Sequence, residues 1–166
     1  SPQFGSSFKL IVSAGSRLSP QLAKSARARL CSNLFSLYGS TETSMVATAP
    51  AHVVETEPNA VGYVLPGTTV EIVSSAGEAL PAGQHGRIRI RTGSMATSYV
   101  GQEEGGPFSD GWFYPGDTGS LTADGLLVIG GRETAVINLG GDKINPETLE
   151  GALQVFPGVT DVAVYS

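Results

Sequence analysis

The sequence of 166 residues contains a single cysteine, Cys31, so no disulfide can form within the chain. This cysteine usage is typical of a reducing compartment, and we expect a cytoplasmic protein. The chain has no apolar run of roughly 18 residues, which excludes a membrane-spanning helix, and no basic segment followed by an apolar one, which a signal peptide requires. The two histidines, His52 and His85, lack metal-ligand spacing and are expected at the surface.

Charge is also scarce, since only 15% of the residues are charged. The 15 acidic and 10 basic residues give a net charge of −5, which gives no support for a nucleic-acid or anionic-membrane partner. The 40% hydrophobic content is typical of a globular chain and not of a disordered one. The 22 glycines and 10 prolines predict many turns and short strands.

The first sixty residues predict a strand–helix–strand unit. Residues 8–14 form an apolar strand that ends at Gly15, residues 19–30 form a helix because a serine N-cap is followed by proline, and residues 33–38 form a second strand. The expected apolar face of the helix consists of Leu22, Ala23, Ala26 and Leu30. Strands of such a unit are parallel, and sites lie at their carboxyl ends. The loops at Gly15 and Tyr38-Gly39 are therefore expected to line one pocket.

The middle of the chain predicts antiparallel strands in a barrel-like or sheet-like arrangement. Residues 87–91 alternate arginine with isoleucine, which indicates a strand with one solvated face. Residues 126–129 form another expected strand, which the Asp124-Gly125 turn opens. The stripe of Arg87, Arg89 and Arg91 is interpreted as that solvated face, with a phosphate site as the alternative.

The last thirty residues predict a hairpin, a helix and a strand. Residues 136–139 and 143–144 are expected to pair across Gly140-Gly141, and Asn145 is expected to cap a helix that begins at Pro146. Residues Leu149, Ala152, Leu153 and Phe156 have the spacing of an amphipathic helix. Residues 162–164 are expected to begin a strand.

Three segments carry a common pattern: Leu37-Tyr38-Gly39-Ser40-Thr41-Glu42-Thr43; Gly111-Trp112-Phe113-Tyr114-Pro115-Gly116-Asp117; and Gly131-Arg132-Glu133 running through Ile137, Gly140, Gly141 and Pro146 to Glu150. In this order and at this spacing they resemble the adenylate-forming superfamily of acyl-CoA ligases, adenylation domains of peptide synthetases, and luciferases. The resemblance implies a reaction in which ATP and Mg²⁺ convert a carboxylic acid into an acyl-adenylate. Most members then transfer the acyl group to a thiol.

The resemblance also implies an α/β fold class and a division of the chain. Residues 1–60 would be the end of the α/β nucleotide-binding part of the large domain, a βαβ piece. Residues 61–133 would be an antiparallel, barrel-like β subdomain. Residues 134–166 would be the start of a small α+β C-terminal domain.

The first segment would supply the adenine and phosphate contacts. The resemblance implies that Tyr38 stacks on adenine, that Thr41 contacts the α-phosphate, and that Glu42 holds Mg²⁺. Gly39 would allow close backbone approach to the nucleotide, and Ser40 would supply donors. A core aromatic at position 38 and a helix-capping carboxylate at position 42 are the alternatives.

Other segments would complete the nucleotide site. Ala14-Gly15-Ser16 resembles the adenine-pocket loop of the family, although an ordinary strand-to-helix turn has the same composition. The resemblance implies that Asp117 accepts hydrogen bonds from the ribose hydroxyls and that Arg132 contacts the ribose. Ile129 would pack near the same sugar, with plain core packing as the alternative. Asp117 has an Asx turn as its alternative.

The third segment would serve thiol transfer. Thr134 occupies the hinge position of the family, where aspartate or lysine is usual. Gly140 and Gly141 match the loop that lines the pantetheine channel, and Lys143 matches a basic position that approaches phosphates or coenzyme A. A hairpin turn and a solvated lysine are the respective alternatives.

Two family elements are absent from the sequence: a Ser/Thr/Gly-rich phosphate loop ending in lysine, and a lysine near the end of the C-terminal domain. We therefore expect an interior fragment of an AMP-forming acyl-CoA ligase that is inactive without the rest of its parent polypeptide. Its expected ligands are ATP or AMP, Mg²⁺, coenzyme A and a carboxylic acid. An adenylation domain that loads a carrier protein and a non-catalytic relic of the fold are the alternatives. A P-loop kinase is disfavoured because no Gly-x4-Gly-Lys-Ser/Thr motif occurs.

Overall fold

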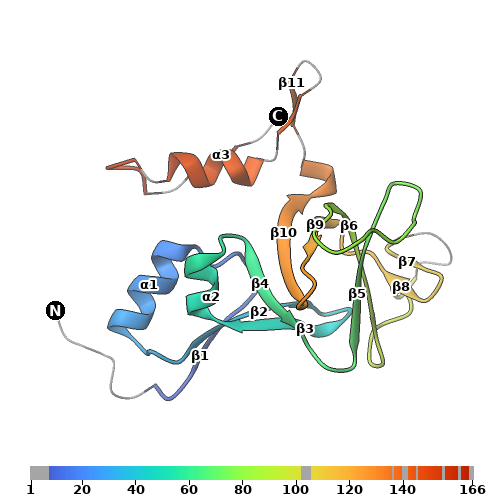
Figure 1. Ribbon diagram of the computed structural model, residues 1–166, viewed down its shortest axis with the longest axis horizontal. Coiled ribbons are helices and arrows are strands. Elements are labelled where there is room, and N and C mark those ends of the chain that lie inside the picture. Colours follow the sequence, from blue (N-terminus) through green and yellow to red (C-terminus); the bar gives the residue numbers. More distant parts are fainter. Residues whose placement is uncertain are drawn as a thin grey trace.

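A computed structural model describes residues 8–101, 106–135, 137–139, 142–144, 146–154, 156–160 and 162–164 (Figure 1). The elements are β1 (Ile11–Ser13), α1 (Pro20–Arg29), β2 (Leu34–Ser40), β3 (Ser44–Pro50), α2 (Ala51–Thr56), β4 (Ala60–Val64), β5 (Thr68–Val73), β6 (Gly86–Thr92), β7 (Phe108–Ser109), β8 (Trp112–Phe113), β9 (Asp117–Leu121), β10 (Leu126–Arg132), η1 (Glu133–Ala135), β11 (Ile137–Leu139), β12 (Asp142–Ile144) and α3 (Pro146–Leu153). The first ten strands form one sheet in the order β1-β2-β3-β4-β10-β9-β6-β8-β7, with β5 paired to β6.

The predicted strand–helix–strand unit is present, and its two strands are parallel. Ser19 caps α1, and its hydroxyl oxygen accepts a hydrogen bond from the Leu22 amide at 3.2 Å. Ala23 is fully buried and packs with Leu34 in the cluster between α1, α2 and the sheet. The expected apolar face is only half correct, because Leu22 is 57% and Leu30 is 37% exposed. Leu22 lies about 100° around the helix from Ala23, and Leu30 is already the C-cap residue beyond the last turn.

The second strand continues further than predicted and turns directly into an antiparallel partner. β2 extends to Ser40 and pairs with β3, and α2 then packs against α1. Neither β3 nor α2 was predicted, because residues 44–56 show no clear periodicity of either kind. The register of β2 and β3 shifts between Tyr38 and Gly39, which indicates a β-bulge at this point.

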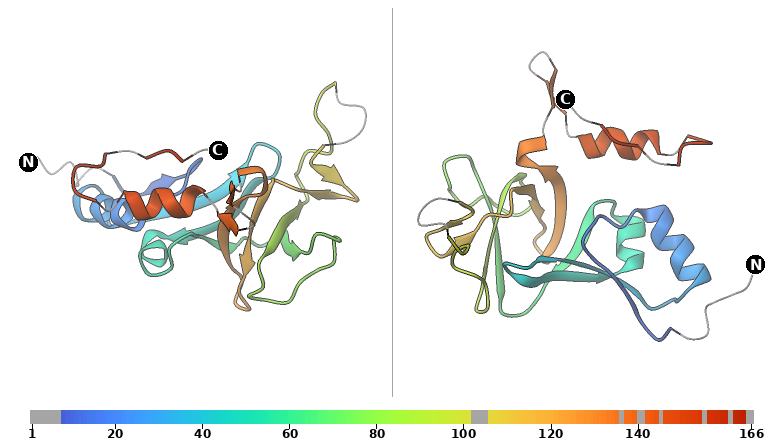
Figure 2. Two further views of the ribbon diagram at one scale, coloured as in Figure 1. Left: turned by 90° about the horizontal axis from the view of Figure 1, so that it is seen from above. Right: turned by 180° about the vertical axis from the view of Figure 1, so that it is seen from behind.

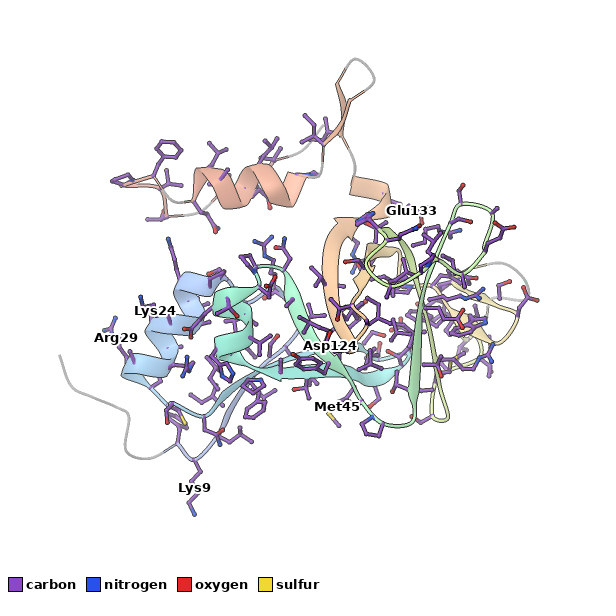
Figure 3. The ribbon with its side chains drawn as sticks, in the orientation of Figure 1. Lys9, Lys24, Arg29, Met45, Asp124 and Glu133 are labelled. Atoms are coloured by element: carbon purple, nitrogen blue, oxygen red, sulfur yellow. The ribbon has the colours of Figure 1, made fainter. Side chains whose placement is uncertain are left out.

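The strands from β4 onward pair antiparallel, as predicted. Their core consists of Val70, Ile72, Ile88, Ile90 and Leu127, together with Val46 and Ala47 of the neighbouring β3. Hydrogen bonding continues across the predicted boundary at residue 60, since β4 pairs with both β3 and β10. Figure 2 shows α1, α2 and β1–β3 on one side of the described chain and β5–β9 on the other. The division into three parts stays a prediction.

The arginine stripe on β6 is only partly solvated. The guanidinium carbons of Arg89 and Arg91 lie over the Trp112 ring, 4.4 Å and 4.0 Å from its centroid. Arg89 also pairs with Glu71, which directly faces it on β5, and its Nε donates at 3.0 Å. Hydrogen bonding from Arg89 to Tyr114 is the main cause of a raised pKa of the guanidinium. The stripe therefore holds residues 112–114 against β6.

The C-terminal part follows the prediction for the hairpin and for the start of the helix, but α3 ends at Leu153, before Phe156, and the last strand is absent. β11 and β12 pair with Ile137 opposite Ile144, and α3 begins at Pro146. Leu149, Leu153 and Phe156 are 36%, 44% and 59% exposed. Residues 162–164 form no strand, because the Val164 amide donates to the Glu150 side chain at 2.8 Å and not to a neighbouring strand. Val136, Gly140, Gly141 and Asn145 lie outside the described residues.

Within the described ranges, no helix has the length and apolar character that a membrane crossing demands.

Candidate functional site

A cavity of about 350 Å³ lies where the parallel unit meets the antiparallel strands. Its walls come from the loop after β1, the end of β2, the start of β4, the segment before β9 and the end of β10. The predicted site residues that line it are Gly15, Ser16, Tyr38, Gly39, Ser40, Glu42, Asp117, Ile129 and Arg132. The expectation that the loops at Gly15 and Tyr38 border one pocket is thereby confirmed.

Three of these side chains are linked inside the cavity wall. The Tyr38 hydroxyl donates to Oδ2 of Asp117 at 2.6 Å, and Nε of Arg132 lies 3.0 Å from Oδ1 of the same carboxylate. Burial, followed by the negative charge and hydrogen bonding of Asp117, raises the pKa of Tyr38 far above its usual range. Tyr38 is therefore a neutral phenol that donates. A carboxylate has about four lone-pair sites, so Asp117 keeps capacity for two further donors.

The environment of Glu42 keeps its carboxylate ionised. Tyr99 donates to Oε1 at 2.6 Å, and the Thr41 hydroxyl donates to Oε2 at 3.1 Å. These contacts, with Tyr99 first and Ser40 next, lower the pKa of Glu42 to about 2. The Ser40 hydroxyl in turn contacts the buried Thr43, whose Oγ1 lies 3.2 Å from Ser40 Oγ.

This donor set fits Mg²⁺. The ion prefers oxygen ligands, and proteins hold it by one or two carboxylates together with substrate phosphates and water. Glu42 offers such a carboxylate at the cavity. In the part of the chain that the structure describes, no three His, Cys, Asp or Glu side chains gather into a closed metal cage. An ion at Glu42 would therefore take its remaining ligands from the substrate and from water.

The structure gives a reason for glycine at position 39 that differs from the predicted approach to a nucleotide. A Cβ at this position would lie 2.1 Å from the Ser44 carbonyl oxygen, a contact that real Cβ atoms do not make. The bulged β2–β3 hairpin thus leaves no room for a side chain at position 39, so glycine is required there. Close approach to a nucleotide stays a prediction.

Among the other predicted residues that the structure describes, Ala14, Thr41 and Thr134 do not line the cavity. Ala14 and Thr41 flank it, and Thr41 contacts it through Glu42. Thr134 is exposed in η1, directly after β10. Lys143 lies in β12 opposite Asn138, while Gly140 and Gly141 are outside the described residues. The structure therefore brings most of the predicted nucleotide contacts together around one cavity, and the predicted thiol-transfer contacts stay predictions.

The cavity also contains residues that the sequence analysis missed. Tyr99, Asn59 and Phe113 line it, and Asn59 has a φ of 76° and a buried Oδ1 with no hydrogen-bond partner among the described residues. Tyr99 lies in a segment of turns without periodicity, so no sequence signal could place its hydroxyl beside Glu42. Phe113 belongs to the recognised Gly111–Asp117 segment and was the one residue of the three that the pattern could have suggested.

The fold is that of adenylate-forming enzymes. The structure of o-succinylbenzoate CoA synthetase from Bacillus subtilis, in complex with ATP and magnesium ion, matches it with a TM-score of 0.84 and 26% sequence identity. The match covers 96% of this chain and 34% of that chain. The chain belongs to the family described as AMP-binding enzyme, whose profile matches residues 1–100.

Curated relatives agree with this assignment. The 2-succinylbenzoate–CoA ligase of Bacillus licheniformis is 34% identical over 131 residues, which are 76% of this chain and 27% of that protein. The fatty acid–[acyl-carrier-protein] ligase ScoC of Streptomyces coeruleorubidus is 30% identical over 159 residues, which are 92% of this chain and 31% of that protein. The chain thus spans about a quarter to a third of the length of these two relatives.

Proposed function

We propose that this chain supplies the nucleotide-binding centre of an AMP-forming acyl-CoA ligase. In the first half-reaction a carboxylate oxygen attacks the α-phosphorus of ATP, and pyrophosphate leaves. In the second, a thiol attacks the acyl carbon, and AMP leaves. The proposal rests on the observation that one cavity is lined by two sets of side chains. The first set is the hydrogen-bonded Tyr38, Asp117 and Arg132, and the second is the ionised Glu42.

The linked group suits a nucleoside. Asp117 has unused lone pairs for the two ribose hydroxyls, and Arg132, with a side chain 61% exposed, can reach ribose or phosphate oxygens. Tyr38, held by its hydroxyl, presents a fixed ring on which adenine can stack. Gly15 and Ser16 border the same cavity, and Ile129, which also lines it, packs against the same hydrophobic core as Tyr38. A volume of about 350 Å³ falls within the range typical of small-molecule pockets.

Glu42 suits the phosphate end. The residue would hold Mg²⁺, which when bound neutralises phosphate charge and stabilises the departing pyrophosphate. Thr41 and Ser40 place hydroxyl groups beside this carboxylate, and on nucleotide binding the Thr41 hydroxyl would redirect its single proton from Oε2 of Glu42 to the α-phosphate. Together these donors reduce the repulsion between two anions that must react.

Thiol transfer rests on the C-terminal residues. We propose that Thr134 is the pivot of the following segment, that Gly140 and Gly141 line the path of the pantetheine arm, and that Lys143 approaches coenzyme A. We further propose that the activity belongs to a longer polypeptide containing this chain, which the greater lengths of the relatives support. A carrier protein is the second acceptor to consider, because one relative is a ligase for acyl-carrier protein by name.

The test is carboxylate-dependent exchange of radioactive pyrophosphate into ATP, measured with the full-length protein and a panel of aliphatic and aromatic acids. Acid-dependent exchange followed by thioester formation with coenzyme A is the expected result. Thioester formation with a holo-carrier protein alone would assign the other acceptor. Absence of exchange with every acid, in a protein that still binds ATP, would favour the non-catalytic relic and overturn the proposal.

A further inference from the structure

Two contacts from one segment hold Glu42. The Tyr99 hydroxyl donates to Oε1 of its side chain at 2.6 Å, and the Ala96 amide donates to its backbone carbonyl at 2.8 Å. This segment lies between β6 and β7, more than fifty positions away in the sequence. A remote part of the chain therefore fixes both the backbone and the carboxylate of Glu42.

Tyr99 is itself fixed by a row of aromatic rings. Its ring meets Phe108 edge-on, with centroids 5.4 Å apart and an interplanar angle of 73°. Phe108 in turn lies 5.1 Å from Phe113, which is buried in the cavity wall. Although Tyr99 is 41% exposed, its position is thus tied to the core and not to solvent.

The contact orients Glu42 without consuming its capacity to bind a cation. Each carboxylate oxygen has two lone-pair sites, and Tyr99 and Thr41 use one on each oxygen. Ser40 also donates toward this carboxylate, and Glu42 lines the cavity and is only half-buried, so the carboxylate stays accessible to a cation from the cavity. A glutamate that is held in this way keeps a single orientation, whereas a free glutamate samples several rotamers.

We propose that Tyr99 is a positioning residue that orients the Glu42 carboxylate toward the divalent cation of the metal–ATP complex. The inference rests on the proposed function of Glu42. Hydrogen-bond partners of metal ligands typically alter metal affinity or activity by about 10–100-fold when they are removed. Loss of the Tyr99 hydroxyl is therefore expected to weaken cation binding by roughly tenfold and to leave the binding of the carboxylic acid unchanged.

The experiment compares Tyr99→Phe with wild type in the full-length protein. Binding of Mn²⁺ in the presence of a saturating non-hydrolysable ATP analogue is measured by electron paramagnetic resonance, so the readout does not depend on turnover. Tyr63→Phe is the matched control, because Tyr63 is 40% exposed, lies on β4 and does not line the cavity. Thermal unfolding checks the fold of each variant.

Glu42→Gln and the double variant separate the possible outcomes. If Tyr99 acts through Glu42, Tyr99→Phe reduces Mn²⁺ affinity in wild type but adds nothing in the Glu42→Gln background. Additive losses, or a change in the Michaelis constant for the acid alone, would mean that Tyr99 makes its own contact and would overturn the inference. Unchanged Mn²⁺ binding in Tyr99→Phe, together with weakened binding in Glu42→Gln, would overturn the inference and leave the proposed function intact.

Unchanged Mn²⁺ binding in Glu42→Gln would instead exclude Glu42 from the metal site. This result would contradict both the inference about Tyr99 and the proposed function of Glu42. Phe108→Leu is a second variant that retains the hydroxyl but removes the edge contact of the rings. A smaller loss of Mn²⁺ affinity in the same direction is expected, and its absence would count against the row of rings as the support of Tyr99.

Discussion

Asp117 and Arg132 face each other in the sheet, and their side chains form an ion pair of 3.0 Å. One residue begins β9 and the other ends β10, so the hairpin register fixes their separation. The ion pair is therefore set by the backbone, and the carboxylate is already oriented toward the cavity before any ligand arrives.

Replacing Asp117 should weaken nucleotide binding more than acid binding. In Asp117→Ala two charge-assisted hydrogen bonds to ribose are lost, each worth roughly 1.5–3 kcal/mol. The measurement is calorimetric binding of ATP and of 2′,3′-dideoxy-ATP, with Glu57→Gln, an exposed carboxylate outside the cavity, as the control. The mutant should discriminate between the two nucleotides far less than wild type. Equal discrimination would show that Asp117 does not bind the ribose.

Replacing Glu42 should impair adenylation and leave the fold intact. Glu42→Gln keeps the size of the side chain and removes its charge, and loss of one electrostatic element at a reacting centre costs roughly 10²–10³ in rate. Pyrophosphate exchange is measured over a series of Mg²⁺ concentrations, alongside thermal unfolding. Rates that match wild type at limiting Mg²⁺ would exclude Glu42 from the metal site.

Thr134 should separate the two half-reactions. Thr134→Pro fixes φ at about −65° and removes a backbone donor. The segment after η1 should then be restricted to one orientation relative to the preceding strands. One half-reaction should survive and the other should fall, while Thr134→Asp should support both. Pyrophosphate exchange and acyl transfer from preformed adenylate are measured separately. Should the proline variant fold normally and slow neither step, or slow both equally, Thr134 is not a hinge.

Gly39 should be intolerant of a side chain for a reason of stability. A Cβ would lie 2.1 Å from the Ser44 carbonyl oxygen, so Gly39→Ala must distort the β2–β3 bulge at a cost of roughly 1–3 kcal/mol. Gly93→Ala is the matched control, because no atom lies within 4 Å of the corresponding Cβ. Chemical denaturation of both variants gives the comparison. A Gly39→Ala protein as stable as Gly93→Ala would contradict the close approach.

The elements that depend on local sequence patterns were predicted correctly. The parallel pair β1–β2, the Ser19 cap and the β11–β12 hairpin follow from short-range signals that the structure retains. The segment from Ser44 to Thr56 gave no such signal, because its alanines and valines fit a strand and a helix about equally well.

The candidate site was also predicted only in part. Tyr38, Asp117 and Arg132 came from the resemblance to the family, and their side chains meet in the fold. Tyr99 did not, because its role depends on a contact with Glu42 that only the folded chain creates. The exposed apolar face of α3 was equally unpredictable, since periodicity locates such a face without indicating what covers it.

Trp112 gives the chain a built-in optical label. It is the only tryptophan in the 166 residues, it is 7% exposed, and two guanidinium groups contact its ring. Its neighbours Phe113 and Tyr114 border the cavity, so a ligand that shifts this segment also shifts the surroundings of the indole. Intrinsic fluorescence from this part of the protein would then follow occupancy of the cavity without any added dye.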